Sequence, residues 1–145
     1  MTERTLRAVI VLLGIYHLAV GLLGLFAPGT FFEEIGRYGA ENLHYVGDVG
    51  AFTAAYGIAL LIAASRRSWW LPMLALGAIW YGLHAGNHAF DIDQARSDAR
   101  GLADTVLLGA VGLALAWLAL MANHVLPGEA RSPRAREPED PSHGE

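Results

Sequence analysis

Ionisable side chains recur at intervals of about one helical turn in the segment from Trp80 to Asp91. Tyr81, His84, His88 and Asp91 are three or four residues apart, so a helix would place them on one face. The surrounding segment is otherwise apolar and long enough to cross a bilayer. Because polar groups at membrane depth need a partner or water, this face is a candidate functional site.

A second pair of ionisable side chains, His44 and Asp48, follows Asn42 and has the same four-residue spacing. Such a pair can supply two metal ligands, or a base and the carboxylate that orients it, or the two groups can simply satisfy each other. Asp104 is a further carboxylate in an apolar stretch. His17 is either a cofactor ligand or a buried histidine that is hydrogen-bonded to a neighbouring helix, and the second interpretation is favoured.

The composition predicts a membrane protein. Of the 145 residues, 54% are hydrophobic and 17% are charged, which is too apolar for a soluble domain of this size. The charges avoid four segments of about 20 residues, the length that crosses roughly 30 Å of hydrocarbon. The predicted spans are residues 8–27, 45–64, 69–90 and 102–122. We therefore predict an all-α fold, a four-helix transmembrane bundle with up-down-up-down topology that occupies residues 1–126.

The connections between the spans also carry signals. Thr30 and Glu33 have the spacing of a capping box, which predicts a short interfacial helix after the first span. The turn from Ser65 to Ser68 is so short that the second and third spans should be antiparallel neighbours. Residues 127–145 are rich in proline, arginine and acid and predict a disordered cytoplasmic tail. Small residues mark packing faces on the first two spans: Gly14, Gly21 and Gly24, then Gly50, Ala54 and Gly57.

Arginine placement predicts the orientation. Arginines precede the first span, lie between the second and third, and follow the fourth: Arg4, Arg7, Arg66, Arg67, Arg131, Arg134 and Arg136. By the positive-inside rule both termini are cytoplasmic, in a multi-pass protein of the cell membrane, here a bacterial inner membrane. The formal net charge of -4 gives no case for nucleic-acid binding. Because the chain has no cysteine, thiolate ligands and thiol chemistry are excluded.

Most of the polar residues are predicted to lie at similar heights in the membrane. Counting about 1.5 Å per residue from the cytoplasmic end of each span, Asp48 and His84 lie roughly 22–24 Å from that end. On the same scale His44, His88 and Asp104 lie roughly 27–30 Å up, and His17 lies near roughly 15 Å. If these faces turn inward, they form one polar pocket at the extracytoplasmic end, in which Asp48 is expected beside His84.

The same residues carry a resemblance to a known group. Asn42-x-His44 with Asp48-Val49-Gly50, His84-x-x-x-His88, and a Pro-x-x-Phe-like loop from Pro28 to Phe31 resemble a family of uncharacterised bacterial four-helix integral membrane proteins, loosely DoxX-like. The resemblance covers roughly residues 8–122. An arginine usually precedes the aspartate in that pattern, whereas Gly47 stands here. The family has no established activity, so the resemblance implies fold and site position alone.

Two functional interpretations follow. The first is a small integral membrane protein with a ligand-binding or accessory role and a polar His/Asp site. The alternative is a metal- or haem-binding protein, or a small membrane enzyme, that uses His44, Asp48, His84 and His88, with Tyr81 as proton donor and His17 as a deeper ligand. Whether the chain is an enzyme stays open. The expected partners are the lipid bilayer, an apolar molecule such as a lipid or quinone, and a second copy or a larger membrane complex.

Overall fold

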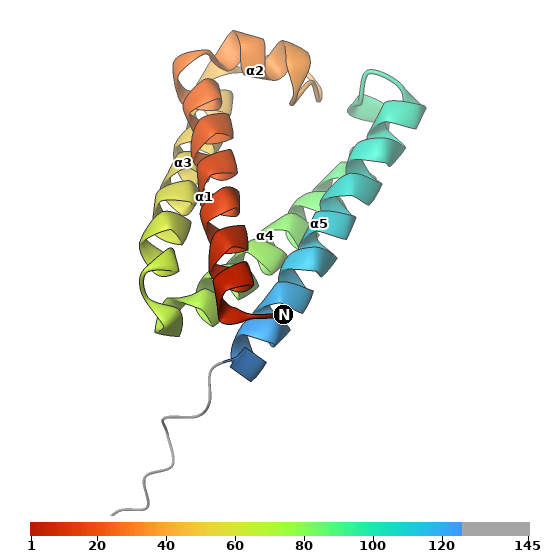
Figure 1. The fold of residues 1–145 in the computed structure, drawn as a ribbon. Coiled ribbons are helices and arrows are strands. Elements are labelled where there is room, and N and C mark those ends of the chain that lie inside the picture. Colours follow the sequence, from red (N-terminus) through yellow and green to blue (C-terminus); the bar gives the residue numbers. More distant parts are fainter. Residues whose placement is uncertain (126–145) are drawn as a thin grey trace, which may run out of the picture.

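The computed structural model describes residues 1–125, which form helices joined by short connections (Figure 1). The long helices are α1 (Glu3–Phe26), α3 (Leu43–Ala64), α4 (Trp70–Phe90) and α5 (Asp98–Val125), and the short elements are α2 (Pro28–Glu34), η1 (Arg67–Trp69) and η2 (Ile92–Gln94). Within these residues there is no β-strand, only one isolated bridge. The all-α prediction is confirmed. The tail predicted at residues 127–145 lies outside the described residues.

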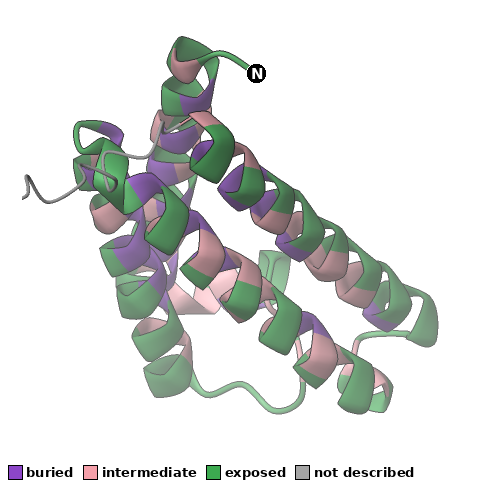
Figure 2. Cartoon of the chain, turned by 90° about the horizontal axis from the view of Figure 1, so that it is seen from below, coloured by how far each residue is buried: buried purple, intermediate pink, exposed green. Residues whose placement is uncertain are grey.

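Three of the long helices, α1, α3 and α5, are long and apolar enough to cross a membrane. Helix α4 is of similar length but carries His84, Asn87 and His88 in its last two turns. Buried residues form stripes along the helices, and much of the outward surface is exposed (Figure 2). That exposed surface includes large apolar side chains such as Leu12 and Leu113. A surface of this kind favours a lipid environment over water.

Small residues bring α1 and α3 into close contact along their length. A Cβ atom added at Gly21 would overlap the backbone of Ala54, and one added at Gly57 would overlap the backbone of Leu18. Gly50 in the same way faces the backbone of Gly24. The two predicted small-residue faces are therefore confirmed as packing faces, and they pack against each other.

Helix α4 packs along α5, and the two helix pairs meet mainly at the end that contains the N-terminus and η1 (Figure 1). Trp70 lies in this core, where its Nε1–H donates to the Ala63 carbonyl at 2.8 Å. The other large side chains that are fully buried there come from all four long helices: Leu6, Ile10, Leu60, Leu74 and Leu115. Beyond this core the pairs diverge, so α3 and α4 are neighbours at the turn but not along their whole length.

At the opposite end, loops bridge the two pairs. Helix α2 begins at Pro28, two residues before the predicted cap Thr30, because proline lacks an N–H and fits the first turn. The following loop reaches the loop before α5, where Gly39 N–H donates to the Gln94 carbonyl at 3.1 Å. Gly39 has φ +60, the left-handed region that favours glycine. This hydrogen bond joins the two helix pairs at this end.

Candidate functional site

His17 links α1 to α4 halfway along the helices. Its side chain is buried (1% exposed), and Nδ1 lies 2.7 Å from the Leu13 carbonyl oxygen. Because a carbonyl only accepts, Nδ1 carries the proton, and Nε2 accepts from the Tyr81 hydroxyl at 2.9 Å. This is the hydrogen-bonded histidine that the sequence interpretation favoured. To bind a cofactor through Nε2, His17 would have to release Tyr81.

Aromatic side chains surround His17 and extend this contact to α3. The Tyr56 ring meets the imidazole edge-on with centroids 5.0 Å apart. Its hydroxyl donates to the Met73 carbonyl of α4 at 2.9 Å. A Cβ at residue 77 would collide with this hydroxyl, so Gly77 permits the bond. Tyr56 was not among the predicted site residues, and the only signal for it in the sequence was a tyrosine in the middle of an apolar span.

His84 and His88 form a polar pair in the last two turns of α4. Their ring centroids are 4.6 Å apart. The Tyr38 ring lies over His88 with centroids 4.2 Å apart, and its hydroxyl donates to the His88 backbone carbonyl at 3.4 Å. The Nδ1 atom of His88 is buried and has no hydrogen-bond partner within residues 1–125. A buried polar atom without a hydrogen bond costs roughly 1–3 kcal/mol, so a ligand that reached this Nδ1 atom and completed its hydrogen bonding would recover that free energy.

Tyr38 contacts His88 from the loop that follows α2. Partial burial raises the pKa of the Tyr38 phenol, and the negative charges of Asp104 and Asp91 raise it further. Its hydroxyl therefore stays protonated at neutral pH and can act as a donor. Asp91 itself accepts from the Gln94 side chain at 3.0 Å.

His44 and Asp48 do not join this group. Their nitrogen and oxygen atoms lie 3.6 Å apart, and the two side chains are 82% and 65% exposed. Asp48 and Gly50 are two residues apart and thus point in nearly opposite directions, so with Gly50 against α1 the carboxylate faces outward. The expected contact between Asp48 and His84 is wrong, since no ionic contact joins them within residues 1–125. Asn42 has a local role, because its side chain accepts from Tyr45 N–H and caps α3.

The structure thus separates the predicted cluster into two pairs and a deeper histidine. In the part of the chain that is described, no three histidine, aspartate or glutamate side chains lie close enough to hold a metal ion. The described chain can offer His84 and His88 together, and a metal would need its further ligands from elsewhere. Asp104, the remaining predicted site residue, forms an ion pair with Arg100 at 3.1 Å.

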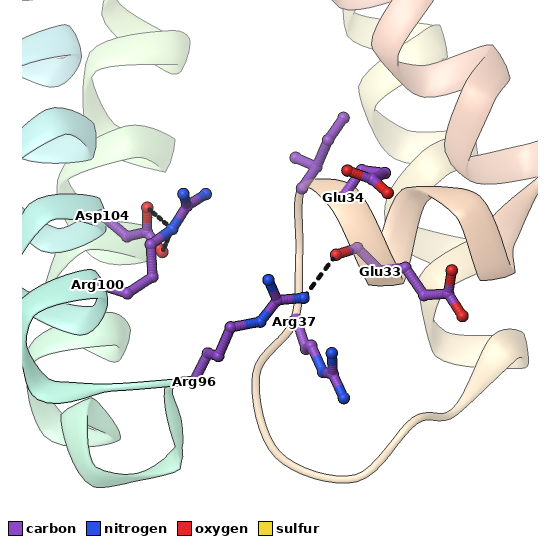
Figure 3. A pocket seen from close by; sticks show the side chains of 7 residues that line it. Glu33, Glu34, Arg37, Arg96, Arg100 and Asp104 are labelled. Carbon is purple, nitrogen blue, oxygen red and sulfur yellow. Dashed lines mark hydrogen bonds and ion pairs between the residues drawn. The ribbon is translucent and has the colours of Figure 1, made fainter.

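This ion pair belongs to a charged pocket that sequence reasoning missed, shown in Figure 3. The pocket has a volume of about 110 Å³ and lies between the end of α2 with its following loop and the start of α5. It is lined by Glu33, Glu34, Ile35, Arg37, Arg96, Arg100 and Asp104. The alternating charges of the two loops were the available signal, but only the loop bridge brings them together.

Comparison of the chain with known proteins does not assign it to a family. No family model matches the sequence, and neither a curated protein nor a solved structure matches it. The function is therefore argued from the residues of the site.

Proposed function

We propose that this chain is a four-span integral membrane protein of the cell membrane that binds a small ligand at its outer end through His84 and His88. In this proposal α4 is the fourth spanning helix, the spans alternate in direction, and both termini are cytoplasmic. This arrangement of four spans is that of the DoxX-like group, whose motifs are similar to those of this sequence. The observation that carries the ligand site is the buried Nδ1 atom of His88, which has no partner within residues 1–125.

The surroundings of His88 support an amphiphilic ligand. Two aromatic rings pack against the His88 imidazole, that of Tyr38 with centroids 4.2 Å apart and that of His84 with centroids 4.6 Å apart. An apolar hollow of about 470 Å³ also lies between α4 and α5, but it is a separate feature, because its lining includes Gly82 and neither histidine, and Gly82 and His84 point in nearly opposite directions. A lipid or quinone has a polar head for the histidines and an apolar body for the surrounding bilayer, and a second copy of the chain remains a further proposed partner.

Mass spectrometry of organic extracts from the purified protein tests this proposal. We expect a small molecule that is retained by the native chain and lost from the His84→Ala and His88→Ala variants. His44→Ala is the matched control, because His44 lies on the exposed pair and should leave retention unchanged. Equal retention by all variants would overturn the histidine site.

The alternative is a metal- or haem-binding protein that uses the same two histidines. Imidazoles one helical turn apart can share a transition metal, and this is the observation in its favour. An absorption spectrum with a Soret band, or a stoichiometric metal lost with His84→Ala, would establish it in place of the organic ligand.

A further inference from the structure

The charged pocket at the outer end is too small for a large ligand. Its volume of about 110 Å³ compares with roughly 300–1,000 Å³ for pockets that enclose drug-sized molecules. Apart from Ile35, all its lining side chains are charged, three positive and three negative. The pocket can therefore accept only a compact polar or charged moiety, of the size of a small headgroup.

The three arginines of the pocket differ in whether a carboxylate forms an ion pair with them. Arg100 donates from Nε to the Asp104 carboxylate at 3.1 Å, so these two charges balance each other. Arg96 donates to the Glu33 backbone carbonyl at 3.2 Å, which orients its guanidinium, and no carboxylate within residues 1–125 forms an ion pair with it (Figure 3). Arg37 makes no hydrogen bond or ion pair with any residue from 1 to 125. Two guanidinium groups are thus available to an anion.

The remaining carboxylates, those of Glu33 and Glu34, add negative charge to the lining of the pocket. In Figure 3 the carboxylate of Glu33 is directed away from the Arg96 guanidinium. Glu34 lines the pocket and, within the described residues, pairs with no cation. A ligand with a separated anion and cation matches this lining better than a simple anion does.

We propose that this pocket binds a phosphate–ammonium headgroup, the chemistry of phosphatidylethanolamine, with its phosphate between Arg37 and Arg96 and its ammonium at Glu34. Guanidinium groups bind phosphate oxygens through paired, charge-assisted hydrogen bonds. The site is held in place without ligand by the bonds from Gly39 to Gln94 and from Arg96 to Glu33. The proposed headgroup binding rests on the membrane insertion proposed above but does not depend on the histidine site.

Native mass spectrometry of the full chain in nanodiscs of mixed phosphatidylethanolamine, phosphatidylglycerol and phosphatidylcholine tests this site. We expect preferential retention of phosphatidylethanolamine, and a loss of about tenfold in its affinity when both guanidinium contacts are removed by Arg37→Gln with Arg96→Gln. Glu34→Gln should abolish the preference over phosphatidylglycerol. Arg4→Gln, an exposed arginine at the other end, is the control and should change nothing.

Further measurements determine whether the headgroup belongs to a lipid or to a soluble molecule, and whether the site exists at all. Soluble phosphoethanolamine that binds in detergent in an Arg37-dependent manner would assign the pocket to a soluble ligand of the same chemistry. His88→Ala should leave lipid retention intact, which distinguishes this site from the histidine site. If the double arginine variant does not fold, Arg96→Lys serves instead and should weaken binding because lysine lacks the planar fork. Equal retention of all three lipids, with no binding of phosphoethanolamine, would overturn the proposal.

Discussion

The position of a polar side chain relative to its helix's packing face determines what it does in this protein. His44 with Asp48 and His84 with His88 have the same four-residue spacing. The first pair lies opposite the glycine face that packs on α1 and is therefore exposed. The second lies beneath a loop tyrosine. Spacing predicted both pairs, but their environments depend on contacts with other elements that spacing does not encode.

The sequence left two roles open for His17, a buried hydrogen-bonded histidine and a cofactor ligand. The structure shows hydrogen bonds to Leu13 and Tyr81, as the first role requires, and the ligand role stays a prediction. A ligand role in this conformation would leave the Tyr81 hydroxyl without its acceptor. The partner could not be predicted, because many residues lie at a similar depth on the neighbouring helices.

Removing the Tyr81 hydroxyl tests this link. In Tyr81→Phe the Nε2 atom of His17 loses its donor while the imidazole stays buried, so we expect the free energy of unfolding to fall by roughly 1–3 kcal/mol. Reversible unfolding in detergent measures the change. Tyr16→Phe is the control, because Tyr16 is 57% exposed, and it should have little effect. Equal stability of both variants would show that the bond contributes nothing.

At the scale of the elements, the predicted spans and the observed helices end at nearly the same residues. Spans ending at 27, 64 and 90 correspond to helices that end at Phe26, Ala64 and Phe90. Apolar length and helix-breaking residues determine these ends locally. Pairing is not local: α1 joins α3 because their glycines allow the backbones to approach, and the sequence does not state which glycine faces meet.

A matched pair of glycine substitutions tests the pairing. In Gly21→Ala the new Cβ would overlap the Ala54 backbone, which cannot move without separating α1 from α3. We expect a loss of roughly 1–3 kcal/mol in stability, as for overpacked cores. Gly82→Ala places a Cβ where no atom lies within 4 Å and should be neutral or stabilising by up to about 1 kcal/mol. Thermal unfolding of both variants in one detergent gives the comparison, and equal destabilisation would contradict the proposed contact.

For the whole molecule, the separation into two helix pairs determines where polar chemistry can occur. Within residues 1–125 the pairs share their apolar core mainly near the N-terminus and η1. His17 and Tyr81 join them at mid-length, and at the other end they are joined through loops. Polar side chains therefore gather at the bridged end, where Tyr38 reaches His88 and Arg96 reaches Glu33. The sequence predicted a polar site at the end of α4 that holds His84 and His88, and the function of that site stays a prediction. The sequence did not predict the loop bridge, which depends on a bond between residues far apart in the chain.

The proposed orientation leads to a prediction for single cysteines, which the natural sequence lacks. Ser65 follows α3 at the η1 end and Ser97 precedes α5 at the bridged end, and both are exposed. If both termini are cytoplasmic, a membrane-impermeant maleimide should label Ser97→Cys on intact cells and Ser65→Cys only after permeabilisation, because α4 then crosses the bilayer between them. Leu83→Cys, exposed on the apolar face, is the control and should resist labelling in both conditions. Labelling of both serine positions from one side would show that α4 does not span the membrane.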